Sequence, residues 1–486
     1  TIADLTVDPT VSEAWGQYRR TLYCWVHFLK NSGRFVMYAP GNLGKGDFNV
    51  YRMFVEAAMG TTRPGGFAAQ VVPDGFYSGA NTAAIRKVML EAYSLDPLLG
   101  FENAAGVWFP EVHRSQKLCI YAAQRAPSPA SAIRARFGIR THGDLAAALS
   151  GDLLRIPVAM IHEFSPDALA VMEFDSQLDI DIASKMYERW PKFGDKKAGP
   201  PHRHYMAEVH MGNDRVLFEG ATSGLPLYEG RMVTHYDHRA KGYRSGRGRS
   251  AVWEELPFDH PDKSIQPQWY VPWDSVPEKT RERLEQFRIG FCDVASPTNE
   301  RALTAAIVPA NALCGHKVPT IVFEDDVSWA YPVMLGVLNS HTLDFLVRKK
   351  VGLSMTYTIF DSLPIPRLPI DHPVVAALAP RVLHLTCTGP EMTPFWNAMA
   401  ERGWVAPVEP DAPVPGLLDE DERLAVIAEI EVIVARDLYG LTPSEMAHVL
   451  ATFPIVARRQ TAKYGEYRTR RLVLEGFERM ARVGGR

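Results

Sequence analysis

The chain has 486 residues, of which 46% are hydrophobic and 22% are charged, and its formal net charge at pH 7 is −3. This length allows two or three domains with full cores, and the composition excludes a disordered chain. The sequence has no secretory signal and no apolar run of the roughly 18 residues that a membrane-spanning helix needs, so we expect a cytoplasmic protein. Its five cysteines lack CxxC spacing, which argues against a zinc ribbon.

The first predicted elements are a helix, a turn and a strand. Phe54 and Ala58 recur at helical spacing, and the Arg-Pro-Gly-Gly segment 63–66 would end that helix. The apolar run 67–72 then suits a buried parallel strand. These elements in this order form half of a doubly wound α/β unit, so we expect residues 1–125 to hold the C-terminal half of such a sheet.

A linker rich in proline, serine and alanine separates this unit from a larger middle region. The linker covers residues 125–131, and the middle region extends over 126–370. The middle region mixes short apolar runs with turns, which predicts a mixed α+β domain. We expect strands at 216–218, 305–308 and 320–323 and an amphipathic helix at 332–347.

The remaining residues, 371–486, are predicted to form a helical region. Helical patterns extend over 420–438, 443–450 and 468–482. Thr442, with Pro443 at the first helical position, is a signal for a helix N-terminus. The tail should therefore contain several helices.

Several segments together resemble one enzyme family. NVYRMFVE, followed by PGG and VVP, resembles the region just after the catalytic motif of the gamma-class adenine-N6 DNA methyltransferases. VWFPEVHRSQKLCIY resembles the hairpin of that family, in which a Phe-Pro pair precedes a polar stretch and a strand. Large restriction–modification methylases, and those of the DISARM and BREX phage-defence systems, are similar in further segments in the same order: PLYEGRMVTHYDHR, DVASPTNERALTAAIVP, LGVLNSHTLDFLVRKKVG, YGLTPSEMAHVLATFP and KYGEYRTRRLVLEGF.

The resemblance implies the C-terminal half of a class I methyltransferase sheet, a target-recognition domain and a helical tail. Such enzymes move a methyl group from S-adenosylmethionine to the N6 atom of an adenine that has been flipped out of the duplex. The sequence lacks the glycine-rich turn that binds the cofactor and the Asn-Pro-Pro-Tyr-type catalytic motif, and it does not begin with methionine. We therefore expect a fragment, or a chain completed by a partner subunit, that transfers no methyl group alone.

The resemblance assigns roles to four residues of the first unit. Phe109 would stack on the flipped adenine, although an aromatic residue at a strand start is more often part of a core. Phe54 would approach the adenine ring of S-adenosylmethionine, and Asn49 and Tyr51 would line the same cleft. From the residues alone, Phe54 could simply pack its helix, and Asn49 could be an N-cap.

Basic and aromatic residues alternate in the segment 235–249, which is the best candidate for contact with double-stranded DNA. A solvated charged loop is the competing interpretation. Two shorter basic segments lie at 315–317 and 348–350. The predicted DNA-binding residues are Arg239, Lys241, Arg244, Arg247, Arg249, His316, Lys317, Lys349 and Lys350.

Three further interpretations remain to be weighed. His202, His204 and His210 are close in sequence, but no cysteine or carboxylate completes a recognisable set, so no metal site is predicted. The chain could instead be a non-catalytic recognition subunit that recruits a separate methyltransferase or nuclease. It could also be an RNA or protein methylase built on the same half-sheet. Other proteins of a defence system are possible partners.

Overall fold

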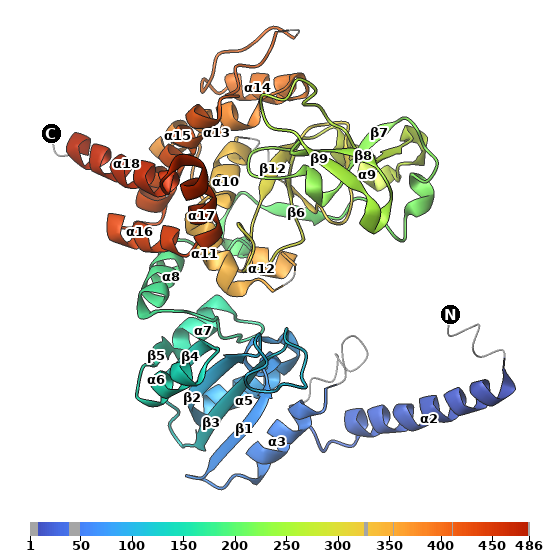
Figure 1. The fold of residues 1–486 in the computed structure, drawn as a ribbon, viewed down its shortest axis with the longest axis vertical. Helices are drawn as coiled ribbons and strands as arrows, with labels where there is room; N and C mark the ends of the chain where they lie inside the picture. Colours follow the sequence, from blue (N-terminus) through green and yellow to red (C-terminus); the bar gives the residue numbers. More distant parts are fainter. Residues whose placement is uncertain (1–7, 38–48, 325–328, 353, 411, 485–486) are drawn as a thin grey trace. The chain divides into compact units, whose positions relative to one another are not determined.

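The computed structural model describes residues 8–37, 49–324, 329–352, 354–410 and 412–484, without the side chains of Lys30, Ala80, Arg249 and residues 481–484. Internal contacts divide the chain into two compact units, Thr1–Asp181 and Ile182–Arg486. Figure 1 shows the elements of both units along the chain. None of the described helices is long and apolar enough to cross a membrane.

The first unit begins with α2 (Pro9–Asn31), which Asp8 caps by accepting from the Thr10 amide at 2.8 Å. Leu29, near its C-terminal end, packs against Met53 and Phe35. Further toward its N-terminus, apolar side chains at alternating spacings of four and three residues are exposed: Val11, Trp15, Tyr18, Leu22 and Trp25. The helix therefore has an apolar face that the described part of the chain leaves largely uncovered.

Five strands of the first unit form one mixed sheet in the order β1-β3-β2-β4-β5. β3 runs antiparallel to β1 and β2, β4 runs parallel to β2, and β5 runs antiparallel to β4. Leu98, Tyr121 and Ala135 are neighbours on three adjacent strands and are completely buried, so the core lies over the middle of the sheet. The strands are β1 (Phe67–Pro73), β2 (Tyr93–Glu102), β3 (Lys117–Arg125), β4 (Ala132–Ile139) and β5 (Leu154–Pro157).

β1 differs from the buried parallel strand that the sequence predicts. It lies at one edge of the described sheet and runs antiparallel to β3, and Phe67 and Val71 are 70% and 56% exposed. Side chains alternate along a strand, so the apolar run buries only one face, with Ala68 and Val72. Over its described strands, the sheet is therefore mixed.

The other helices of the first unit lie before, between and after these strands along the chain. They are α3 (Tyr51–Thr61), α4 (Gly75–Ser78), α5 (Ala83–Ala92), α6 (His142–Leu149) and α7 (Val158–Phe164), and α8 (Gln177–Arg189) crosses into the second unit. Arg86 of α5 is buried and donates to the carbonyls of Phe76 at 2.8 Å and Ala168 at 3.0 Å. This contact ties the segment after β1 to the end of the unit.

In the described part of the second unit, the strands form three small sheets, in the orders β12-β11-β14-β6, β10-β7-β13 and β8-β9. Their strands are β6 (Arg203–Met206), β7 (Leu225–Tyr228), β8 (Lys241–Ser245), β9 (Val252–Glu255), β10 (Trp269–Val271), β11 (Arg288–Phe291), β12 (Ala305–Val308), β13 (Leu313–Cys314) and β14 (Thr320–Phe323). The strands predicted at 305–308 and 320–323 are confirmed as β12 and β14. The strand predicted at 216–218 is wrong: Val216 is 85% exposed within a short 3₁₀ turn, η4 (Arg215–Leu217).

Helices form the rest of the second unit: α9 (Glu278–Leu284), α10 (Ala330–Leu338), α11 (His341–Lys350), α12 (Tyr357–Asp361), α13 (Pro373–Thr386), α14 (Thr393–Ala400), α15 (Glu420–Val432) with a π-helical turn η9 (Ile433–Leu438), α16 (Pro443–Ala451), α17 (Pro454–Tyr464) and α18 (Arg468–Gly484). The single helix predicted at 332–347 is two helices, because Ser340 caps α11 by accepting from the Leu343 amide at 3.1 Å. Thr442 and Glu445 form the predicted cap of α16 as a reciprocal capping box.

The two units also differ from the domain boundaries that the sequence predicts at residues 125 and 370. β4 and β5 extend the first sheet past residue 125, because β4 pairs with β2. Past residue 370, α13 packs on α10: a Cβ atom at Gly336 would lie 3.1 Å from Val382 and 3.3 Å from Leu378. The helical tail is therefore part of the second unit.

Candidate nucleic-acid interface

The loop between β2 and β3 carries Phe109 and is held from inside by Asn103. The Asn103 side chain is almost fully buried. Its amide nitrogen donates to the carbonyls of Phe109 at 2.8 Å and Val112 at 3.2 Å, and its oxygen accepts from the Phe109 amide at 3.1 Å. The backbone at Phe109 is therefore fixed at both its amide and its carbonyl.

Trp108 and Phe109 are adjacent in this loop but have opposite environments. The Trp108 ring meets Phe101 edge-on, with centroids 5.0 Å apart, and its indole nitrogen donates to the Ile139 carbonyl at 3.2 Å. Phe109 is 42% exposed. Trp108 thus packs against the core, whereas Phe109 is partly exposed.

The three residues predicted to face the cofactor lie at the start of α3. Asn49 accepts a hydrogen bond from the Tyr51 amide at 3.3 Å, although Val50 is the N-cap residue of the helix. Tyr51 is half-buried, and burial raises the pKa of its hydroxyl to about 12. Phe54 is 66% exposed, so it does not pack the helix against the described core.

A polar cluster that sequence reasoning missed follows the C-terminal end of β1. Glu173 accepts from the Tyr77 hydroxyl at 2.6 Å and from the Lys117 ammonium at 2.7 Å. Burial, with the nearby Glu173 carboxylate, raises the pKa of Asp74. Ligands of open α/β sheets bind at such strand ends. The Pro-Asp-Gly turn at 73–75 was the available signal, but no local pattern brings Glu173 to it.

The predicted basic loop is a two-stranded ribbon, β8–β9, and its cations differ in their environments. Lys241 pairs with Glu255 at 3.1 Å, and Arg244 pairs with Glu254 across the ribbon. Arg247, at the tip, is exposed and lies over the Trp269 ring, 5.8 Å from its centroid. The side chain of Arg249 lies outside the described residues.

Arg239 does not belong to the exposed part of this loop. It is 3% exposed, its guanidinium lies 3.2 Å from Glu391, and it donates to Thr388 at 2.9 Å. The prediction that Arg239 lies on a DNA-binding surface is therefore corrected, because the residue is buried and an internal ion pair occupies its charge.

His316 and Lys317 are neutral or paired within their own surroundings. His316 stacks on His210 with ring centroids 4.3 Å apart, and its Nδ1 accepts from the Met211 amide at 3.1 Å. Burial, together with His210 and Lys317, lowers the pKa of His316. Lys317 pairs with Asp293 at 2.6 Å. This segment therefore offers a phosphate less charge than its sequence implies.

The basic run at the end of α11 is partly structural. Arg348 lies over the Phe453 ring at 4.2 Å. Burial and the charge of Lys192 lower the pKa of Lys350 to about 7, and its ammonium donates to the Ser362 hydroxyl at 3.0 Å. Lys349 is half-buried and lies 5.7 Å from the Phe345 ring centroid. Lys350 is therefore only partly charged at neutral pH.

Two of the segments that resemble the methyltransferase family, 293–309 and 335–352, are joined by buried polar contacts. Asp344 is completely buried and accepts from Arg301 at 2.6 Å. The Asn339 amide group donates to the Ala305 carbonyl and accepts from the Ala305 amide, both at 3.0 Å. The polar turn at 299–301 is thus a clasp within the second unit.

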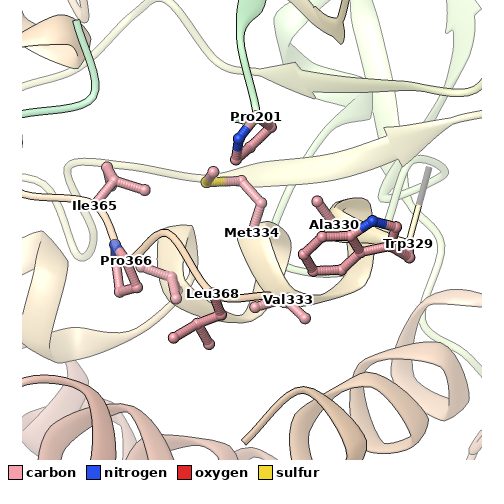
Figure 2. A pocket seen from close by; sticks show the side chains of 9 residues that line it. Pro201, Trp329, Ala330, Val333, Met334, Ile365, Pro366 and Leu368 are labelled. Atoms are coloured by element: carbon pink, nitrogen blue, oxygen red, sulfur yellow. The ribbon is translucent and has the colours of Figure 1, made fainter. Parts of the chain in front are cut away.

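Among the described residues, the histidines belong to no set of three metal-ligating side chains, and a pocket beside α10 is apolar. His204 hydrogen-bonds Arg283 at 2.6 Å, and no group of three metal-ligating side chains lies together among the described residues. Figure 2 shows a pocket beside α10 that is lined by apolar side chains, among them Met334, Ile365 and Leu368. It has no more room than a single water molecule needs.

Comparisons with known proteins leave the family open. No protein-family model matches the chain, and no curated protein matches it. Among solved structures, the Type IIL restriction-modification enzyme MmeI in complex with DNA is similar over 85% of this chain and 53% of that chain, with 12% identity and a TM-score of 0.39. The type IIG restriction endonuclease BpuSI is similar over 89% of this chain and 50% of that chain, with 10% identity and a TM-score of 0.31. The chain spans about half the length of these two proteins, and so loose a likeness defines neither fold nor function.

Proposed function

We propose that the chain is the C-terminal portion of a DNA adenine-N6 methyltransferase that acts in restriction–modification or phage defence. The observation that carries the proposal is the exposed ring of Phe109 on a loop that Asn103 holds rigid. The order of the resembling sequence segments supplies the reaction class, and the β8–β9 ribbon supplies a surface for the duplex.

The chemistry requires an aromatic face for a base that has left the duplex. A flipped base loses its stacking neighbours, and stacking on an aromatic side chain returns about 1–3 kcal/mol. Phe109 suits this role because its side chain is exposed and its backbone is held by hydrogen bonds with Asn103. Little conformational entropy is therefore lost when a base binds.

The cofactor proposed for this reaction is S-adenosylmethionine, which supplies the methyl group. The exposed Phe54 ring fits contact with an adenine ring, and Tyr51 and Asn49 lie at the start of the same helix. The remaining cofactor contacts and the catalytic motif would come from further sequence of the same protein or from a partner subunit. The free edge of β1, with Phe67 and Val71 exposed, is a surface that such a partner could cover.

The proposal is tested by replacing Phe109 in the complete enzyme, meaning this chain together with the part that carries the cofactor site. Phe109→Ala should lower methyl incorporation into duplex DNA by roughly ten- to a hundredfold, because one stacking contact is lost. Phe109→Tyr should retain most activity. Val112→Ala, in the same loop and similarly exposed, is the matched control.

Unchanged kinetics of Phe109→Ala with intact folding would return this residue to a purely structural role and remove the main support of the proposal. A non-catalytic recognition subunit is the second candidate, and the free edge of β1 favours it because a partner strand could pair there. The mass of the natural polypeptide separates the two candidates, since a complete methyltransferase would also contain the cofactor and catalytic motifs.

A further inference from the structure

The tip of the β8–β9 ribbon is a turn with a glycine of positive φ on each side of Arg247. Gly246 and Gly248 have φ angles of +80° and +57°. A Cβ atom at Gly246 would lie 2.2 Å from the Ser250 carbonyl oxygen, so no other residue fits there. Arg247 is therefore presented at the apex of a narrow two-stranded ribbon.

Side chains of the ribbon and its neighbours hold this turn rigid. The Gly246 carbonyl accepts from the Tyr243 hydroxyl at 2.6 Å and from the Gln268 side chain at 3.4 Å. The Arg247 carbonyl accepts from the amide and the hydroxyl of Ser250, at 3.1 and 2.8 Å. The backbone that carries Arg247 is thus fixed before any ligand arrives.

The guanidinium of Arg247 rests on an aromatic ring that is itself anchored. Its central carbon lies 5.8 Å from the centroid of Trp269, and Trp269 packs against the buried Phe218 with centroids 5.2 Å apart. Among the described side chains, no carboxylate pairs with Arg247, whereas Glu255 and Glu254 neutralise Lys241 and Arg244. Among the described cations of this ribbon, Arg247 is therefore the one whose charge remains able to bind a ligand.

We propose that Arg247 reads a guanine base in the major groove of the target duplex; this inference rests on the proposed function and names one of its specificity-determining residues. The major groove admits a two-stranded β-ribbon, and an arginine fork can donate to guanine O6 and N7 together. A phosphate contact needs only a positive charge, but a planar fork held on an aromatic ring matches a fixed pair of acceptors.

The test is a selection by the full chain from duplexes with a randomised core, followed by sequencing of the bound fraction. The expected result is a preferred motif with guanine at one position. Arg247→Ala should lose that preference by roughly 5- to 150-fold, with other positions unchanged. Arg247→Lys should lose part of it, because an ammonium replaces the planar fork. Arg247→Lys should keep the dependence of affinity on salt, because its charge remains. Arg215→Ala, which removes an exposed cation elsewhere in the unit, is the matched control.

Each remaining outcome decides against the inference in a distinguishable way. If Arg247→Ala keeps the guanine preference while the salt dependence of its affinity flattens, Arg247 contacts a phosphate only. If Arg247→Ala selects the same motif as the unaltered chain, another residue reads the base while the proposed function stands. If the unaltered chain selects no motif, it reads no base, and if it binds no duplex, the proposed function fails together with this inference.

Discussion

Glu391 lies between two basic side chains inside the second unit. His238 Nε2 is 3.0 Å and Arg239 Nε is 3.2 Å from its carboxylate. Burial alone would raise the pKa of Glu391, but the hydrogen bond from His238 and the charges of His238 and Arg239 lower it to about 2. Because the folded pKa is depressed, this carboxylate stabilises the fold above its ordinary pKa of 4.5, and that contribution is lost as the pH falls from 4.5 toward 2.

Replacing Glu391 with glutamine should therefore destabilise the protein in a pH-dependent manner. At pH 7, Glu391→Gln should lower the free energy of unfolding by on the order of 3 kcal/mol. The difference from the unaltered chain should shrink as the pH falls below 4.5, as measured by urea unfolding at a series of pH values. Glu429→Gln, which removes a surface partner of Arg381, is the control. A difference that stays constant across this range would contradict the assignment.

Single-residue environments were the hardest feature to predict from sequence. Arg239 reads as part of an exposed basic loop because Glu391, which neutralises it, is far away in sequence. Trp108 and Phe109 are equally apolar, and only the contact of Trp108 with Phe101 decides which of them enters the core. Contacts between distant segments determine such environments, and local patterns contain no information about them.

At the scale of elements, the contact between the turn at 299–301 and α11 should reduce stability the most when it is broken. Asp344→Asn would leave the mostly buried Arg301 without its counter-ion and weaken the hydrogen bonds to the amides of Ala302 and Leu303. Breaking a buried ion pair on one side costs about 3–5 kcal/mol. Urea unfolding should show a loss of this size.

An exposed ion pair provides the comparison for the clasp. Glu219→Gln removes the partner of Arg215 four residues away, where both side chains are about half exposed. Such exposed pairs contribute about 0.2–1 kcal/mol. Equal effects of Asp344→Asn and Glu219→Gln would mean that the clasp is no stronger than a surface contact.

The sequence predicted correctly those elements whose ends are determined by residues close to them in the chain. The capping box at Thr442 marked the start of α16, and the apolar runs at 305–308 and 320–323 had the length and composition of buried strands. The helix at 332–347 was predicted as one because its apolar pattern continues through Ser340, whose cap was missed. The direction of β1 depends on its partner β3, so its own composition could not reveal it.

At the scale of the whole molecule, the net charge of −3 means that long-range attraction cannot drive DNA binding. The proposed duplex binding would therefore depend on local cations, and two of those on the β8–β9 ribbon pair with Glu254 and Glu255. Glu254→Gln should free Arg244, tighten duplex binding and steepen its salt dependence by roughly 0.9 if the freed cation meets a phosphate. Fluorescence anisotropy at several salt concentrations measures this slope. An unchanged slope would place Arg244 away from the duplex.

The uncovered face of α2 provides an optical signal for whatever binds there. Trp15 and Trp25 are 37% and 61% exposed, so water should shift their emission to long wavelengths. Trp396, by contrast, is buried in the second unit and should emit at short wavelengths regardless of what covers α2. Any molecule that covers the helix would move the emission of Trp15 and Trp25 to shorter wavelengths and shield them from a dissolved quencher. The chain thus carries an intrinsic reporter of any binding to this face of α2.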